Sequence, residues 1–187
     1  MFDNAEKIYL LALARNTIKY YLDTGKQLRL KPQEVSQKKL VEEGACFVTM
    51  YIGKELRGCV GTLEAHQPLV FDVIENAINA AFRDSRFYPL TKPELSKIKI
   101  SISVLTPHVP FDVKGPEDLL MKLVPGKHGL IMQRGLARAT FLPAVWEQLP
   151  KKEEFLKHLS MKAGLSPDGW KGRDVKYFVY ESEEFSE

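Results

Sequence analysis

The chain is poor in cysteine and lacks a long apolar run. Its 187 residues include two cysteines, Cys46 and Cys59, which are too few for the disulfide framework of a small exported domain. The apolar stretch Ile8 to Ala14 is too short to span a bilayer, and the residues before it are partly acidic, unlike the start of a signal peptide. These absences predict a cytoplasmic protein with no membrane partner.

A strong charge of either sign is also missing. The sequence has 27 basic and 24 acidic side chains, a formal net charge of +3. The densest basic pairs, Lys38-Lys39 and Lys151-Lys152, are followed within a few residues by glutamate pairs. Nucleic-acid binding gains from clustered Lys and Arg side chains that neutralise phosphates. We therefore expect no nucleic-acid partner.

The common catalytic and cofactor motifs are absent. There is no G-x-G-x-x-G, Walker lysine loop, G-x-S-x-G, C-x-x-C or C-x-x-x-C-x-x-C sequence, so the chain is not itself a radical SAM enzyme. No histidine pair has the i, i+4 spacing of a helical metal site. A mixed site of Cys59, His66 and His128 stays open, but these residues are far apart in sequence. We expect no metal ion and no cofactor.

Hydrophobic periodicity predicts helices and strands that are interspersed along the chain. Helices are expected over 3–24, 69–83, 115–123 and 153–163, with a turn or two within 37–43. Strands are expected over 45–52, 56–63, 98–105, 129–133, 137–142 and 175–180, followed by a frayed acidic tail. In helix 69–83, Asp72 and Asn76 belong to a polar stripe opposite the apolar one. In strand 98–105, Ser101 and Ser103 face away from the buried isoleucines.

Hairpins break any regular β-α-β alternation, which favours a particular fold class. The pattern predicts an α+β fold with a largely antiparallel sheet flanked by helices, rather than a doubly wound fold. No internal repeat or long linker divides the chain, so residues 1–187 are expected to form a single domain. Subdomain joints are expected near 107–115 and 143–152.

The segment Leu56-Arg57-Gly58-Cys59-Val60-Gly61, hereafter the hexapeptide, differs from an ordinary strand because it contains two glycines. Glycine inside a strand often marks a bulge or a close approach by a ligand or another backbone. In an extended chain, Arg57 and Cys59 share one face, and a nearby guanidinium favours the reactive thiolate. The alternative is that Cys59 is a small buried residue of a tight hairpin.

Two further stretches offer partners for the hexapeptide. Asp84, Arg86 and Phe87 follow a predicted helix and precede a proline, so they belong to a loop. Asp84 and Arg86 can clamp a polar ligand there, or only fix the loop by an ion pair. His128 lies in a turn, where it is either a general base for Cys59 or a surface histidine without a role.

The hexapeptide resembles the hallmark sequence of the AMMECR domain family, whose usual fifth residue is isoleucine in place of Val60. The likeness runs in order along nearly the whole chain. It is carried by 44–49, 76–77, 80–87, 94–95, 102–105, 126–129, 141–143, 162–165 and Trp170.

The resemblance implies an α+β protein with two packed subdomains and a groove lined by the hexapeptide. It also implies a place in the AmmeMemoRadiSam system, beside a Memo-like protein and a radical SAM protein, where the family member is protein A. The family's activity is not established, so the resemblance names no reaction.

Two functions are compatible with these residues. In the first, the groove around the hexapeptide is enzymatic and acts on a small polar substrate. Cys59 and His128 are then catalytic, and Arg57, Gly58, Gly61, Asp84, Arg86 and Phe87 bind the substrate. In the second, the chain is a non-catalytic accessory module that docks a partner protein or peptide in the same groove. The sequence leaves open whether the protein is an enzyme.

Overall fold

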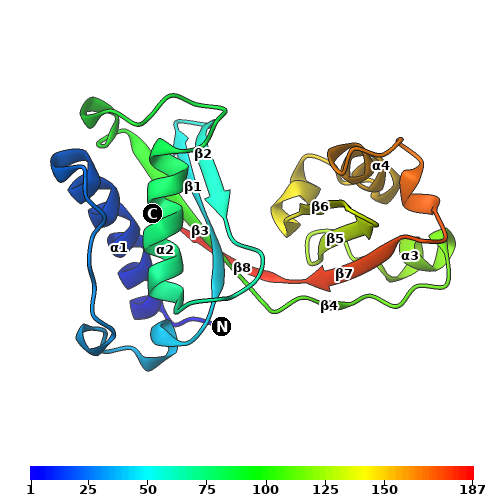
Figure 1. The fold of residues 1–187 in the computed structure, drawn as a ribbon, viewed down its shortest axis with the longest axis horizontal. Coiled ribbons are helices and arrows are strands. Elements are labelled where there is room, and N and C mark those ends of the chain that lie inside the picture. Colours follow the sequence, from blue (N-terminus) through cyan, green and yellow to red (C-terminus); the bar gives the residue numbers. More distant parts are fainter. The chain divides into compact units, whose positions relative to one another are not determined.

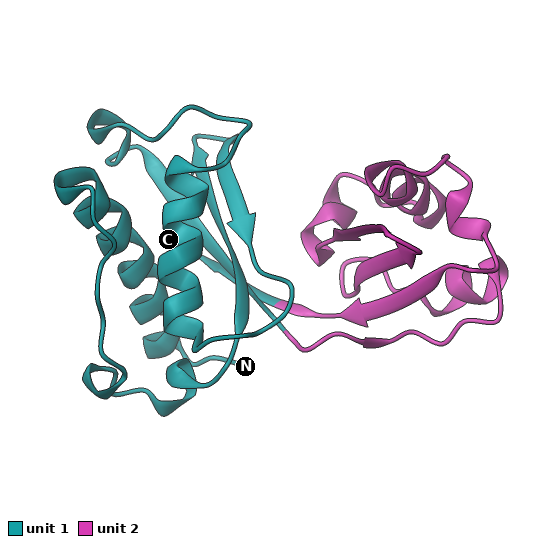
Figure 2. Ribbon diagram, in the orientation of Figure 1, with its two compact units in different colours: residues 1–105, 183–187 teal, residues 106–182 magenta.

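The computed structural model describes all residues, 1–187, and divides into two compact units (Figure 2). The first unit contains Met1–Leu105 together with Glu183–Glu187, and the second contains Thr106–Ser182. The chain therefore leaves the first unit after Leu105 and returns to it at Glu183. The segment 143–152 lies inside the second unit.

The helices and strands alternate irregularly along the chain (Figure 1). The α-helices are α1 (Asn4–Thr24), α2 (Leu69–Phe82), α3 (Pro116–Lys122) and α4 (Lys152–Lys162). The strands are β1 (Ala45–Ile52), β2 (Glu55–Gly61), β3 (Ile98–Leu105), β4 (Val109–Pro110), β5 (Gly129–Arg134), β6 (Ala137–Phe141), β7 (Lys176–Tyr180) and β8 (Ser182–Ser186). Short 3-10 helices are η1 (Pro32–Glu34), η2 (Lys38–Val41), η3 (Lys92–Glu94), η4 (Pro143–Glu147) and η5 (Gly169–Lys171).

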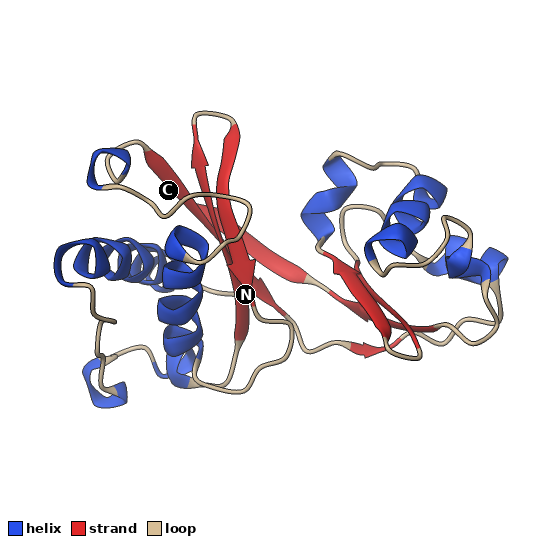
Figure 3. Ribbon diagram, turned by 45° about the horizontal axis from the view of Figure 1, so that its top comes forward, coloured by secondary structure: helices blue, strands red, loops and turns tan.

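The sheet of the first unit has the strand order β2-β1-β3-β8. β1 pairs antiparallel with both β2 and β3. Helices α1 and α2 cover one face of this sheet, and Figure 3 shows both on the same side. The side chains that point to the helices form the core of the unit; from the strands these include Cys46, Val48, Met50, Ile98, Ile100 and Ile102.

The second unit has its own sheet, in the order β4-β7-β5-β6. Its core contains Trp146 stacked on Phe155, with ring centroids 3.7 Å apart, and the buried side chains of Trp170 and Tyr177. The two antiparallel sheets with their helices confirm the predicted α+β class.

Local sequence signals account for both ends of α1. Helix α1 begins at the N-cap Asp3, whose carboxylate accepts from the Glu6 N–H, while the Glu6 carboxylate accepts from the Asp3 N–H. It ends at Gly25, which takes a φ of 67°. The predicted helices and strands are present, with ends shifted by a few residues at most.

The prediction of a frayed acidic tail is wrong. Residues 182–186 form β8 in the first sheet. The acidic side chains of this C-terminal segment have partners far away in sequence: Glu183 pairs with Lys7, and Glu187, just after β8, pairs with Arg15. A strand whose register depends on such distant contacts has no local signature. The two-residue strand β4 was not expected either.

One expectation about polar faces is also wrong, and a second holds only in part. Asp72 and Asn76 are buried, because their side chains face the start of β1 and Thr62, with which they form hydrogen bonds. Ser101 and Ser103 alternate with the core isoleucines, as expected, but they are buried rather than exposed to solvent. The Ser101 hydroxyl donates to Glu184 of β8, the strand that the sequence did not reveal.

No helix of the structure combines the length and the apolar composition that a membrane crossing requires.

Candidate functional site

The hexapeptide forms strand β2 of the β1-β2 hairpin, and the pairing shifts in its middle. Leu56 lies opposite Tyr51, but Gly58 lies opposite Met50, so Arg57 is an extra residue without a partner on β1. This is a β-bulge, which bends the strand and redirects the side chains around it. As a result, Cys59 lies opposite Thr49.

Both glycines of the hexapeptide are required by packing. A Cβ atom at Gly58 would lie 2.2 Å from the Ala80 carbonyl oxygen of α2. A Cβ atom at Gly61 would lie 2.2 Å from the Phe47 ring. A Cβ atom cannot approach a backbone atom so closely, so Gly58 has room only for glycine, whereas a side chain at Gly61 would require the Phe47 ring to move. The glycines bring β2 against its neighbours, and this accounts for them without a ligand.

The Asp84–Arg86 pair holds the outer edge of β2. β2 is an edge strand, and its outward-facing backbone groups need partners other than a strand. The Cys59 N–H donates to the Asp84 carboxylate at 2.9 Å, and Arg86 Nη2 donates to the Cys59 carbonyl oxygen at 3.1 Å. Arg86 also donates to both oxygens of Asp84. The two side chains thus take the place of a neighbouring strand.

These contacts affect the protonation of Asp84. The side-chain hydrogen bond from Arg86 is the largest cause that lowers its pKa to about 2, assisted by the backbone N–H of Cys59 and opposed by desolvation. The carboxylate is almost buried, with 6% of its side chain exposed. Asp84 is therefore ionised at neutral pH and fully engaged, which makes it unsuitable as a proton carrier.

Arg57 fixes the other end of the same loop. Its Nε donates to the Glu94 carboxylate at 2.8 Å, and its Nη2 donates to the Tyr88 carbonyl oxygen at 3.0 Å. The side-chain hydrogen bond from Arg57 is the largest cause that lowers the pKa of Glu94 to about 2. Arg57 Nη1 is buried without a hydrogen-bond partner. The expected pairing of Arg57 with the Cys59 thiol is replaced by these contacts.

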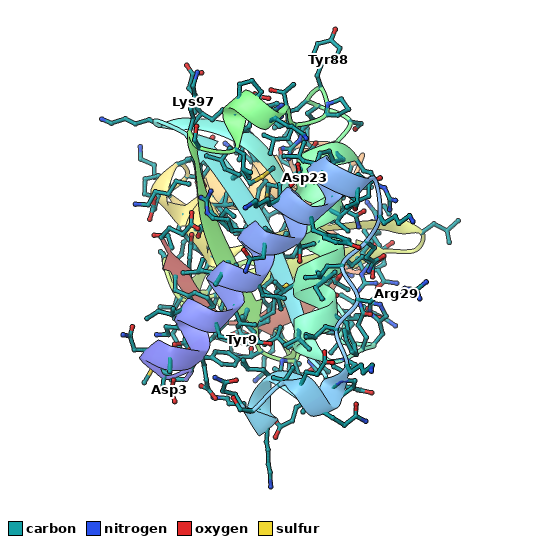
Figure 4. The ribbon with its side chains drawn as sticks, turned by 90° about the vertical axis from the view of Figure 1, so that its left-hand side faces the viewer. Asp3, Tyr9, Asp23, Arg29, Tyr88 and Lys97 are labelled. Atoms are coloured by element: carbon teal, nitrogen blue, oxygen red, sulfur yellow. The ribbon has the colours of Figure 1, made fainter.

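Residues 84–94, hereafter the edge loop, are thus tied to β2 at two points. Phe87 lies between the two arginines, with its ring centroid 6.0 Å from Arg57 Cζ and 5.4 Å from Arg86 Cζ. Tyr88 is 91% exposed and points away from the ribbon in Figure 4. The loop therefore presents an exposed aromatic side chain on a fixed base.

The Cys59 thiol has one polar contact within its unit. The Thr49 hydroxyl donates to Cys59 Sγ at 3.3 Å. Cys59 is half-buried, whereas Cys46 is fully buried. Burial is the largest cause that raises the pKa of the Cys46 thiol well above its usual value, followed by the charge of Asp72. The two cysteines therefore have very different environments.

A buried polar cluster holds the far end of β2. The Asp72 carboxylate accepts hydrogen bonds from the Cys46 N–H, the Thr62 hydroxyl and the Asn76 amide. Asn76 also donates to Thr62 and to the Cys46 carbonyl oxygen. This cluster links α2 to the start of β1 and to the residue that follows β2, so it positions the hexapeptide from behind.

His128 belongs to the second unit, whereas Cys59 belongs to the first. Within its unit, His128 Nδ1 accepts from the Val124 N–H, and its carbonyl oxygen accepts from the Trp146 indole. Desolvation is the largest cause that lowers its pKa. His66 lies in the first unit, where Nδ1 contacts the Glu64 carbonyl oxygen of its own loop. No three His, Cys, Asp or Glu side chains gather as a metal-binding cluster.

The structure thus brings together most of the residues singled out in the sequence, namely Arg57, Gly58, Cys59, Gly61, Asp84, Arg86 and Phe87. Sequence reasoning gave no role to Thr49, which contacts the thiol, or to Glu94, which pairs with Arg57. The spacing of Thr91 and Glu94 is typical of a capping box, which the structure contains, but this local pattern does not indicate a partner on β2. The groove itself stays a prediction.

Comparison with known proteins agrees with the fold and with the family resemblance of the sequence. The profile of the AMMECR1 family matches residues 11–185. The chain belongs to the AMMECR1 family.

Archaeal relatives of this AMMECR1 chain match it from end to end. It is 40% identical to protein MK0488 of Methanopyrus kandleri, covering 96% of this chain and 87% of the relative. It is 37% identical to protein MJ0810 of Methanocaldococcus jannaschii, covering 97% and 90%. The crystal structure of protein PH0010 from Pyrococcus horikoshii is similar with a TM-score of 0.89 and 35% identity, covering 97% and 91%. None of these names states a reaction or a ligand.

Proposed function

We propose that this AMMECR1-family protein is a non-catalytic binding module that docks a partner protein through the edge loop of its first unit. The observation that supports this is the pairing of Asp84 and Arg86 with both backbone groups of Cys59. The Asp84 carboxylate and the Arg86 guanidinium, which could have served catalysis, instead hold the loop against β2.

The side chains that the loop presents suit protein recognition. Tyrosine and arginine are enriched among the residues that dominate binding energy at interfaces. Tyr88 is 91% exposed, and the Arg86 side chain is 55% exposed. Binding costs less when such residues are already fixed, because little conformational freedom is then lost. The loop meets this condition through its anchors at Cys59 and Arg57.

The partners that we propose are the Memo-like and radical SAM proteins that the family resemblance implies. A direct test measures the affinity of each purified partner for the wild-type chain and for Tyr88→Ala. Loss of an interface tyrosine is expected to weaken binding by about tenfold or more. Leu136→Ala is the matched control, because Leu136 is fully exposed and lies in the second unit.

The proposal is wrong if Tyr88→Ala and Leu136→Ala bind equally well, or if neither partner binds at about 10 μM. Cys59→Ser gives a separate check, because a docking module should keep its affinity when the thiol is replaced by a hydroxyl.

Thiol chemistry on a small polar substrate is the second candidate, favoured by one contact. The Thr49 hydroxyl donates to Cys59 Sγ, so a polar group of β1 lies beside the sulfur, the atom that would act as the nucleophile. No histidine of the first unit hydrogen-bonds the sulfur, and Asp84 is engaged. This candidate therefore lacks a proton acceptor within the unit.

Alkylation by iodoacetamide, followed by mass spectrometry, separates the two candidates. Cys46 provides the baseline, since it is fully buried with a raised pKa. For a docking module, Cys59 should react no faster than glutathione at neutral pH. A rate at least about tenfold above glutathione, reduced by Thr49→Val, would favour thiol chemistry instead.

A further inference from the structure

The second unit contains a pocket that is separate from the edge loop. Its volume is about 450 Å³, and it lies at the first turn of α3, at η5 and at the segment leading into β7. Pockets of this size commonly accommodate small organic molecules. All the residues that line it belong to one compact unit.

The polar residues of the pocket carry charge of one sign. Lys114, Lys171 and Arg173 line it, and no acidic side chain does. Lys171 forms a salt bridge with Asp168, but Lys114 and Arg173 form none. The nearby carboxylates are already occupied, because Asp118 pairs with Lys122 and Asp174 pairs with Arg134.

The remaining wall is apolar and partly aromatic. Trp170, Tyr177 and Leu119 line it and are buried. The Tyr177 hydroxyl donates to the Trp170 carbonyl oxygen, which ties the two aromatic residues together. A buried apolar wall beside unpaired cations suits a molecule with an apolar body and an anionic group.

Trp170, one of the lining residues, also has a buried indole N–H without a partner. The Trp170 indole N–H is buried and has no hydrogen-bond partner, whereas the Trp146 indole N–H donates to the His128 carbonyl oxygen at 2.7 Å. Buried polar groups without partners are rare in folded proteins. The Trp170 indole N–H can therefore report ligand binding at the pocket by NMR, and the Trp146 indole N–H serves as a reference outside the pocket.

We infer that this pocket binds a small organic anion. The apolar body of the ligand packs against Trp170 and Tyr177, and its carboxylate or phosphate group pairs with Lys114 and Arg173. The inference does not depend on the docking function proposed for the edge loop, because every residue that it uses lies in the second unit.

Three probes with one aromatic body test the charge requirement. The probes are 1-naphthylacetate, neutral 1-naphthylacetamide and cationic 1-naphthylmethylamine. Each is titrated into the ¹⁵N-labelled full chain while the two indole N–H signals are followed by NMR, with Trp170→Phe identifying the signals. Naphthylacetate should shift the Trp170 signal saturably and leave that of Trp146 in place. The amide should bind about tenfold more weakly, and the amine should cause no shift.

Two double variants test which cationic side chains bind the anionic group of the probe. Lys114→Ala combined with Arg173→Ala should weaken naphthylacetate binding by about tenfold or more. Lys127→Ala combined with Lys157→Ala is the control, since both lysines lie outside the pocket and should leave the affinity unchanged. Adding 1-naphthyl phosphate to the series then distinguishes a carboxylate site from a phosphate site by the tighter ligand.

Three results would overturn the inference. One is the absence of a saturable Trp170 shift up to about 10 mM naphthylacetate. Another is equal affinity for all three probes, which would mean adventitious apolar binding only. The last is unchanged naphthylacetate affinity in the Lys114→Ala, Arg173→Ala double variant.

Discussion

The β2 edge in the first unit and the pocket in the second unit contain similar kinds of residue, but their polar groups are used differently. Both combine cationic side chains, aromatic rings and glycines. At the β2 edge, Arg57 and Arg86 pair with Glu94 and Asp84. In the pocket, Lys114 and Arg173 have no acidic partner among the lining residues.

This difference distinguishes polar groups that hold the fold together from polar groups that are available to bind a ligand. Ion pairs that also bind backbone groups keep an edge strand in place and leave little for a substrate. Cationic side chains that lack an acidic partner and lie beside an apolar wall can form charge-assisted hydrogen bonds with the anionic group of a ligand. Packing therefore accounts for most of the hexapeptide, the most conspicuous motif of the sequence. The pocket, in contrast, corresponds to no sequence motif.

The two regions should differ most in their tolerance of a methyl group at glycine. Gly58→Ala is expected to lower the free energy of unfolding by about 3 kcal/mol, because its Cβ would overlap the Ala80 carbonyl oxygen, a backbone atom that cannot move alone. Gly115→Ala, in the pocket wall, should change it by less than about 0.5 kcal/mol, since no atom lies within 4 Å of its Cβ. Urea unfolding followed by circular dichroism measures both.

Gly61→Ala gives an intermediate case for the same measurement. Its Cβ would meet the ring of Phe47, a half-buried side chain that can rotate, so a cost of about 1 kcal/mol is expected. If Gly58→Ala were as mild as Gly115→Ala, the glycines of the hexapeptide would need an explanation other than packing.

Removing the carboxylate that holds the β2 edge is expected to have the next largest effect. Asp84→Ala leaves the Cys59 N–H and the Arg86 guanidinium without their partner, which should cost about 2 kcal/mol of unfolding free energy. Asp23→Ala is the control, because the Asp23–Lys92 pair is exposed to solvent and should contribute little to stability. Equal costs for the two variants would show that Asp84 does not hold the strand.

Acid should act on the same carboxylate. The folded-state pKa of Asp84 is about 2, below the value near 4 expected for an unfolded chain. The pair therefore stabilises the protein fully above about pH 4 and loses this contribution as the pH falls towards 2, a change of about 2 kcal/mol. Glu94, also at about 2, adds a smaller amount because its side chain is a quarter exposed and screened by solvent.

Urea unfolding between pH 2 and 7 tests this directly. The Asp84→Asn variant should show a shallower loss of stability at acid pH than the wild type. An identical slope would mean that other carboxylates dominate acid unfolding.

The smallest effects on stability are expected at the side chains assigned to binding. Tyr88→Ala and Lys114→Ala should each change the unfolding free energy by less than about 0.5 kcal/mol, since both side chains are exposed. Thermal denaturation provides the measurement. A larger loss in either variant would indicate a structural role and would weaken the corresponding binding proposal.

Much of the fold could be predicted because its signals are local. The Asp3 cap, the Gly25 stop and the alternation in 98–105 each depend on residues close together in sequence. The fold class follows from these elements. Strand β8 could not be predicted, because its polar residues are stabilised by Lys7 and Arg15, about 170 positions away.

The candidate site could be predicted in part. The loop containing Asp84 and Arg86 was expected beside the hexapeptide, and the structure brings them into contact. The role of Thr49 could not be foreseen, because it depends on the bulge: if Arg57 paired regularly with Met50, then Val48, not Thr49, would lie opposite Cys59.

The sequence by itself determined the family, the fold class and the segment that distinguishes this chain. Only the tertiary structure decided how that segment is used. Close packing of Gly58 on α2 and a one-residue shift in pairing direct Arg57 to Glu94 and leave the Cys59 thiol with Thr49. Such choices depend on contacts between elements distant in sequence, and local residue patterns carry no information about them.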